Sequence, residues 1–247
     1  MARRRRTRFP VAFGLVAALG ACAAGPTKRP AAEQAQLGLF TSLPIYWGEA
    51  ADITAMLNSD EPPHWARAAL EQQYTLAPMD VLDAESLQDL DDLILAQPRP
   101  LAPSENVALD DWVRAGGRAL VFADPMLAQH SIFPIGDKRR PQDVVLLSPI
   151  LARWGLVLRY DEAQAAGIRI IEDGDLALPV TRAGTFAATG QGEDSTCDLS
   201  AESTIARCTI GEGSALIVAD ADLLDPHAEP ASAAAFDELV TRAFSVR

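Results

Sequence analysis

Three short apolar segments constrain the fold of this chain more than any other feature. Residues 92–96 (DLILA), 118–123 (RALVFA) and 214–219 (SALIVA) are almost entirely apolar. Such segments are typical of strands buried on both faces of a parallel sheet. Helix-forming segments separate them along the chain. We therefore predict an α/β domain of three layers, in which helices cover both faces of a mostly parallel sheet.

The remaining elements follow from the same kind of pattern. Periodicity and turn residues predict strands at 37–43, 74–81 and 156–159, and helices at 64–73, 105–115, 148–154 and 231–244. Ser104 is the expected N-cap of the helix that starts at residue 105. The expected buried stripe of that helix consists of Val107, Leu109, Trp112 and Val113.

The N-terminus has the organisation of a bacterial export signal. Five arginines lie within residues 3–8, an apolar run occupies residues 11–19, and Leu19-Gly20-Ala21-Cys22 follows. This ending resembles the lipobox of bacterial lipoproteins. The resemblance implies cleavage before Cys22 and acylation of Cys22, palmitate included. We expect a signal peptide at 1–21, a lipidated tether at 22–36 and one folded domain at 37–247. The alternative is an ordinary signal peptide with an incidental cysteine.

The same resemblance implies a location. Ala23 follows the cysteine where an aspartate would favour retention in the inner membrane of a Gram-negative bacterium. Delivery to the outer membrane is therefore permitted, and the inner membrane stays open as the alternative. In both cases the domain faces the periplasm.

The charge of the chain excludes one class of partner. There are 21 basic and 34 acidic residues, for a formal net charge of −13. Removal of residues 1–21 takes away five arginines and no acidic residue, which gives a net charge of −18. A domain this acidic repels phosphate backbones, so we expect no nucleic-acid partner.

The C-terminal third departs from the alternating pattern. Residues 168–171 and 176–180 flank Asp173-Gly174 and predict a hairpin. The polar, glycine-rich segment 181–209 predicts a β-rich excursion. With Cys22 lipidated, Cys197 and Cys208 remain, and an exported domain is expected to join them in a disulfide. Metal binding by this pair is the weaker alternative, because no histidine lies near them.

Polar residues follow the predicted strands where ligands of parallel sheets bind, at the carboxyl ends. The candidate ligand-binding residues at these ends are Trp47, Glu49, Gln97, Asp124, Asp220 and Asp222. If the three aspartates converge, they suit a hard cation such as Mg²⁺ or Ca²⁺. We favour the alternative, in which they cap helices and form turns. Trp47 is equally well explained as a lid on the core. We expect no cofactor and no bound metal.

A single basic cluster stands out in the acidic domain. Lys138, Arg139 and Arg140 are consecutive and form a candidate patch for a partner or an anion. The alternative, a solvated loop, is the commoner role of such a run.

Several of these segments together resemble a known family. They are DDLILAQP (91–98), RAGGRALVFADP (114–125), WGL (154–156) and GEGSALIVADADLL (211–224). Over residues 37–224 the chain resembles the auxiliary domain of uncharacterised ABC-type transport systems, which include a gliding-motility auxiliary component. The family is similar in fold to class I glutamine amidotransferases, a flavodoxin-like arrangement. The resemblance implies an extracytoplasmic domain that works with ABC transporter ATPase and permease subunits.

Amidotransferase chemistry itself is not expected. It needs a cysteine nucleophile on a tight strand-to-helix turn, with a histidine base and a glutamate that orients it. The matching turn holds Ala123-Asp124-Pro125, although His227-Ala228-Glu229 resembles the family's His-x-Glu pair. We therefore predict a non-catalytic protein. The alternatives are a module that senses a small molecule, and an enzyme of unknown type that uses the strand-end carboxylates.

Overall fold

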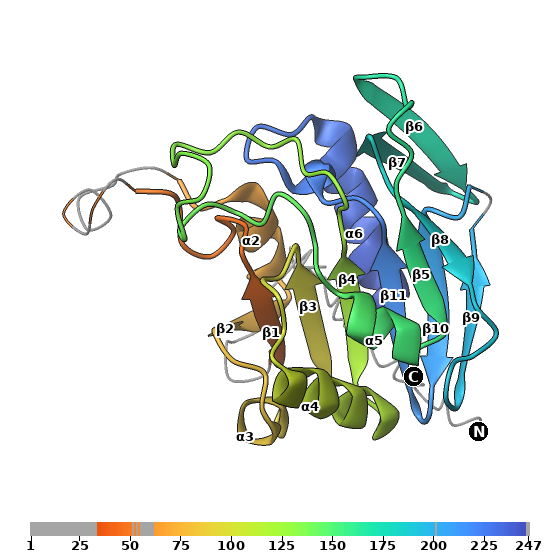
Figure 1. Ribbon diagram of the computed structural model, residues 1–247. Coiled ribbons are helices and arrows are strands. Elements are labelled where there is room, and N and C mark those ends of the chain that lie inside the picture. Colours follow the sequence, from red (N-terminus) through yellow and green to blue (C-terminus); the bar gives the residue numbers. More distant parts are fainter. Residues whose placement is uncertain (1–33, 51, 53, 55–61, 201, 246–247) are drawn as a thin grey trace, which may run out of the picture.

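A seven-stranded sheet forms the centre of the molecule (Figure 1). The computed structural model describes residues 34–50, 52, 54, 62–200 and 202–245. The predicted signal peptide, Cys22 and most of the predicted tether therefore lie outside the described residues. The strands, in their order across the sheet, are β2 (Tyr74–Met79), β1 (Ala35–Thr41), β3 (Asp92–Ala96), β4 (Arg118–Phe122), β11 (Gly213–Val218), β10 (Ile205–Ile210) and β9 (Ser195–Leu199).

The predicted mostly parallel sheet is confirmed. Strands β2, β1, β3, β4 and β11 run parallel, and only β10 and β9 are antiparallel to their neighbours. Every residue of β3 is buried. Leu93 and Leu95 point into one core, and Ile94 and Ala96 point into the other. This two-sided burial is the physical reason for the continuous apolar pattern of β3.

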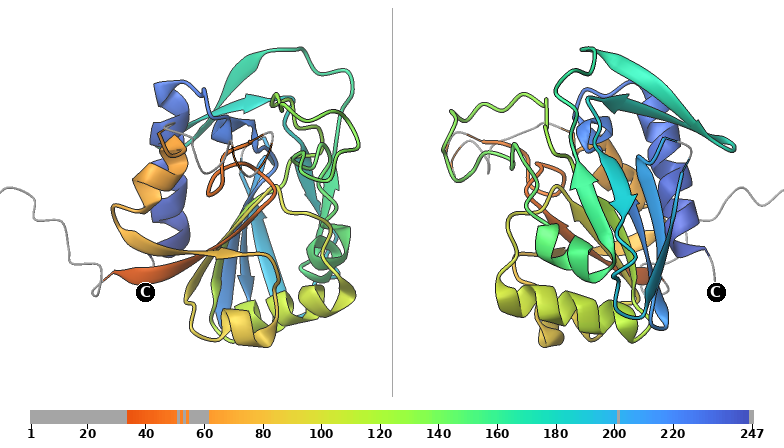
Figure 2. Two further views of the ribbon diagram at one scale, coloured as in Figure 1. Left: turned by 90° about the vertical axis from the view of Figure 1, so that its left-hand side faces the viewer. Right: turned by 45° about the vertical axis from the view of Figure 1, so that its right-hand side comes forward.

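Helices cover both faces of the sheet, as Figure 2 shows. Helices α2 (Trp65–Leu70) and α6 (Pro230–Phe244) pack on one face. Helices α3 (Ala84–Leu87), α4 (Pro103–Arg114) and α5 (Ser148–Arg153) lie on the other. The three-layer prediction is therefore correct. None of the helices in the described residues is both long enough and apolar enough to cross a bilayer.

The C-terminal third is β-rich, as predicted, but its strands are not a separate excursion. Strands β9 and β10 extend the central sheet, and the disulfide between Cys197 and Cys208 joins them at directly opposite positions. Strand β8 (Thr185–Ala188) pairs with β5 (Leu156–Arg159). The predicted hairpin consists of β6 (Ile168–Asp173) and β7 (Leu176–Thr181). Its turn is Gly174-Asp175, because Asp173 already pairs with Leu176.

Three local predictions are wrong. Strand β1 begins at Ala35, inside the segment predicted as tether. Ser104 is not an N-cap: α4 begins at Pro103, two residues before the predicted start. Ala102 is in the N-cap position, and its N–H is accepted by the side chain of Glu105. The side chain of Val107 is 60% exposed. The buried positions 105, 109 and 113 are spaced by four residues, and position 107 is on the opposite side of the helix from them.

Candidate functional site

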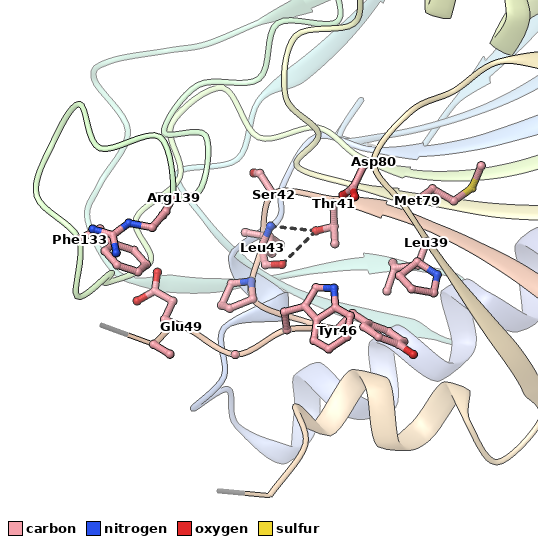
Figure 3. Close-up of a pocket in the computed structure, with 15 residues that line it drawn as sticks. Leu39, Thr41, Ser42, Leu43, Tyr46, Glu49, Met79, Asp80, Phe133 and Arg139 are labelled. Carbon is pink, nitrogen blue, oxygen red and sulfur yellow. Dashed lines mark hydrogen bonds between the residues drawn. The ribbon is translucent and has the colours of Figure 1, made fainter. Parts of the chain in front are cut away.

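A cleft lies at the carboxyl ends of β1 and β2 (Figure 3). It consists of two adjoining hollows of about 230 Å³ each. The first, the aromatic hollow, is lined by Tyr46, Trp47 and Phe133 among others. The second, the basic hollow, is lined by Arg99 and the segment 138–140 among others. Both hollows share Thr41, Ser42, Met79, Asp80 and Arg139, so we treat them as one edge cleft.

The position of the edge cleft follows from the topology. In chain order, the five parallel strands lie in the order 2-1-3-4-5 across the sheet, so the direction of winding reverses between β1 and β3. Ligands of open α/β sheets bind outside the carboxyl ends of the strands at such a reversal. The lining residues Ser42 and Arg99 come directly after β1 and soon after β3.

Two hydroxyl groups that line the edge cleft, those of Thr41 and Ser42, form hydrogen bonds with backbone groups. Thr41 Oγ1 donates to the carbonyl of Ala96 (2.8 Å) and accepts the N–H of Leu43 (2.9 Å). Ser42 Oγ donates to the carbonyl of Gln97 (2.5 Å) and accepts the N–H of Gln142 (3.0 Å). Both hydroxyls are engaged with backbone groups, which fixes the turn after β1 and leaves neither oxygen paired with a general base.

An aromatic pair forms one wall. The Trp47 ring meets the Tyr46 ring edge-on, with centroids 4.8 Å apart. The guanidinium of Arg67 lies 4.2 Å from the centre of the Tyr46 ring and donates to the Tyr46 carbonyl (2.8 Å), and Glu71 in turn binds Arg67. Trp47 itself is 62% exposed, so it is not a lid on the core. Helix α2 thus holds Tyr46, and Tyr46 supports an indole that faces solvent.

Glu49 connects this wall to the opposite one. Its carboxylate accepts the hydroxyl of Ser131 (2.5 Å) and the N–H of Ile132 (2.7 Å). Both donors belong to the long loop between β4 and α5. Glu49 therefore positions the loop that carries Phe133 and the basic cluster, and both of its oxygens already have partners.

The predicted basic patch lines the basic hollow. Arg139 stacks on Phe133 at 4.1 Å and binds Asp137 (2.7 Å), which holds the pKa of that carboxyl at about 2. Arg140 binds Asp143 (3.0 Å). Lys138 is exposed and is the only lysine among the residues that the structure describes. These contacts hold the segment 137–143 together where it lines the basic hollow.

Arg99, which follows β3, also lines the basic hollow. It donates to both oxygens of Glu105 (2.8 and 2.7 Å) and lies 4.9 Å from the centre of the Phe40 ring. Its hydrogen bonds are the main reason that the pKa of Glu105 falls to about 2. This anchored cation had not been predicted, because the short segment Gln97-Pro98-Arg99-Pro100 gave no sign of where the arginine would point.

The three strand-end aspartates converge beside the edge cleft but do not line it. Oxygens of Asp124, Asp220 and Asp222 lie within 4.8 Å of one another. Burial raises the pKa of Asp124 to about 6. Burial, followed by the charge of Asp124, raises that of Asp222 to about 7. Burial and the charges of both neighbours raise that of Asp220 well above its usual range.

The hydrogen bonds of this aspartate trio match the turn-forming role that we favoured. Asp124 accepts the N–H groups of Met126 (2.7 Å) and Ala221 (3.0 Å). Asp222 accepts the N–H of Ala128 (3.0 Å). Asp220 accepts the N–H groups of Thr181 (2.8 Å) and Leu223 (3.3 Å). Carboxylates are the ligands that hard cations prefer, but these oxygens already fix the backbone where three segments meet.

Gln97 has a related role. It is fully buried with a positive φ of 43°, and its amide donates to the carbonyls of Asp124 (3.0 Å) and Gln142 (2.8 Å). Its side-chain oxygen Oε1 accepts the N–H of Asp124 (2.8 Å). Gln97 therefore joins the ends of β3 and β4 to the long loop and does not face the edge cleft.

The family model for the ABC-type uncharacterised transport system matches residues 35–172, more than half of the chain. The chain belongs to this family. The match supports a role as an auxiliary component of such a transport system, and the matched part contains the whole edge cleft. A comparison with curated proteins found no match.

Solved structures resemble this chain at low identity, and one of them has a TM-score above 0.5. The mmIFT52 N-terminal domain has a TM-score of 0.54 and 12% identity, with 86% of this chain and 98% of that chain covered. A putative ThuA-like protein from Bacteroides uniformis ATCC 8492 has a TM-score of 0.48 and 11% identity, with 91% and 97% covered. The exo-β-1,4-mannosidase Op5Man5 from Opitutaceae bacterium strain TAV5 has a TM-score of 0.46 and 12% identity, with 85% of this chain and 33% of that chain covered. This chain spans only about a third of that enzyme's length.

Proposed function

We propose that this family member is a non-catalytic, lipid-anchored auxiliary component of an ABC-type transport system, and that the edge cleft is its recognition site. The observation that carries the proposal is the position of the cleft. It lies within the matched residues, at the winding reversal of the sheet, where such folds bind ligands. The 2-1-3-4-5 strand order also supports an amidotransferase-like, flavodoxin-like fold.

The chemistry of the edge cleft supports a non-catalytic role. Among its described lining residues there is neither a cysteine nor a histidine. The hydroxyls of Thr41 and Ser42 donate to backbone carbonyls and not to a base. The turn after β4 carries Asp124-Pro125 where an amidotransferase needs its nucleophile. The strand-end carboxylates, which an unknown enzyme would have to use, bind backbone N–H groups instead.

The geometry of β1 suits a lipid anchor at Cys22. The edge cleft lies at the carboxyl end of β1, and the chain enters this strand at the opposite, amino end. A strand of seven residues spans roughly 20 Å. A tether attached there would hold the cleft away from the membrane surface and turn it toward a partner in the periplasm.

Co-purification from native membranes tests this proposal. The full chain carries a C-terminal tag, and mass spectrometry identifies its partners and its N-terminal peptide. We expect ABC ATPase and permease subunits and an acylated Cys22. The matched control is Cys22→Ser, which should lose membrane attachment and recover fewer of these subunits. Recovery of a soluble, unacylated protein without transporter subunits would contradict the proposal.

A further inference from the structure

We propose that the edge cleft binds a small amphipathic anion: a molecule with one aromatic or aliphatic ring and a carboxylate or phosphate group. The ring would occupy the aromatic hollow, and the anionic group the basic hollow. This inference rests on the proposed function, because it specifies what the recognition site takes. It draws together Trp47 and the basic cluster, which are 91 residues or more apart in the sequence.

The aromatic hollow provides a surface for a ring. The indole of Trp47 is 62% exposed although Tyr46 and Arg67 hold its support in place. Leu39, Leu43 and Met79 also line the aromatic hollow. A large aromatic ring that is open to solvent and supported by a fixed neighbouring ring is well suited to stacking against a ring of a ligand.

The basic hollow provides the complementary charge. Four cations line it, namely Arg99, Lys138, Arg139 and Arg140, against a single acidic residue, Asp80. The carboxylates that pair with three of these cations, Glu105, Asp137 and Asp143, are not among its described lining residues. Their ion pairs hold the three arginines in place. With these three carboxylates and Asp80 the formal charges balance, so an anion would bind here through the N–H donors that the four cationic side chains bring to the lining.

Two acidic residues refine the choice of ligand. Both oxygens of Glu49 already accept hydrogen bonds from the long loop, so Glu49 does not require a cationic ligand. Asp80 lines both hollows. It would accept a hydroxyl or N–H group located between the ring and the anionic end. The two hollows of about 230 Å³ each together reach the lower range of small-molecule sites, which fits a molecule of one ring.

Tryptophan indole resonances of the full chain, purified in detergent and ¹⁵N-labelled, provide the first measurement. The four tryptophans give four indole signals, and Trp47→Leu assigns one of them. The probes are indole-3-acetate and phenyl phosphate, with benzyl alcohol as the neutral ring and inorganic phosphate as the anion without a ring. We expect the two amphipathic anions to shift the Trp47 signal with dissociation constants on the order of 1 mM. Benzyl alcohol and inorganic phosphate should each bind at least about fivefold more weakly than the two amphipathic anions.

Lysine protection provides a second, independent readout. The chain has two lysines, Lys28 and Lys138. Bound phenyl phosphate should slow acetylation of Lys138, while Lys28 serves as the internal reference. Lys138→Gln with Arg139→Gln should weaken binding of both anions about fivefold or more. The matched controls are Arg169→Gln and Ile168→Ala on β6, outside the described lining, and they should leave binding unchanged.

The outcomes separate this inference from the proposed function. The inference is overturned if the protein is folded and neither anion shifts the Trp47 signal. It is also overturned if benzyl alcohol, or inorganic phosphate alone, binds as tightly as the two amphipathic anions. If transporter subunits nevertheless co-purify, the proposed function stands. If the anions bind as expected but no transporter subunit co-purifies, the cleft chemistry is correct and the proposed partner is wrong.

Discussion

The Glu49 carboxylate and the Ser131 hydroxyl meet at 2.5 Å, although 82 residues separate them in the chain. The same carboxylate accepts the N–H of Ile132 at 2.7 Å. These bonds join the segment after β1 to the loop after β4, and so they connect the two walls of the edge cleft. Contacts within the chain therefore hold the two walls of the cleft together.

Glu49→Ala should loosen the loop without unfolding the domain. It removes the acceptor for one hydroxyl and one backbone N–H, which together contribute about 1–3 kcal/mol. We expect faster hydrogen exchange of the amides around residues 131–133, measured by mass spectrometry, with near-normal exchange in β3 and β4. Glu85→Ala, at an exposed glutamate of α3, is the control. Unchanged exchange at 131–133 would contradict the proposed role of Glu49.

The aspartate trio should lower the free energy of unfolding as the pH rises from about 4 to about 7. The pKa of Asp124 is raised to about 6 and that of Asp222 to about 7, from an ordinary value of 3.8. The folded protein therefore keeps protons that the unfolded chain has released. Their contribution to stability is complete below about pH 4 and is lost as the pH rises to about 7.

Asp222→Asn tests this sign directly. The amide oxygen can still accept the N–H of Ala128, but position 222 no longer ionises. Near pH 4 the two proteins should be about equally stable. At pH 8 the variant should be more stable by about 2 kcal/mol, roughly half of the full shift, since solvent screens a partly exposed group. Urea unfolding at both pH values measures the difference, with the exposed Asp161→Asn as control. A variant less stable than the wild type at pH 8 would refute the assignment.

The disulfide should contribute substantially to stability. Cys197 and Cys208 are 11 residues apart in the sequence, and closing a loop of this length stabilises by about 3 kcal/mol in the chain-entropy treatment. Cys197→Ser with Cys208→Ser should therefore lower the thermal midpoint clearly. Reduction of the unfolded wild type should produce the same midpoint as the variant. If the wild type and the double variant melt together, the bond does not form in the exported protein.

The fold was largely predictable because its central strands are buried on both faces. The patterns of β3, β4 and β11 predicted the parallel sheet, since each of these strands points side chains into two cores. The alternation of strands and helices did not reveal that β9 and β10 join the central sheet, and they were predicted as part of a β-rich excursion. Both strands carry mixed polar and apolar residues, and they join the sheet through the pairing of β10 with β11, which the pattern of β10 alone does not reveal.

The candidate site was only partly predictable, for a similar reason. Trp47, Glu49 and the segment 138–140 were singled out separately, and the structure brings them to one cleft. Their proximity depends on a long loop that crosses the sheet edge, and no local pattern encodes its path. Gln97 was expected to face a ligand. It instead satisfies buried backbone groups, a role that polar residues at strand ends often take.

Cross-linking mass spectrometry on intact membranes tests the central claim most directly. Because the chain has two lysines and 34 acidic residues, a reagent that joins amines to carboxylates suits it best. An auxiliary component predicts cross-links between this chain and the periplasmic parts of an ABC permease, reduced by Cys22→Ser. Cross-links confined to the chain itself, or to proteins unrelated to ATP-driven transport, would contradict the claim.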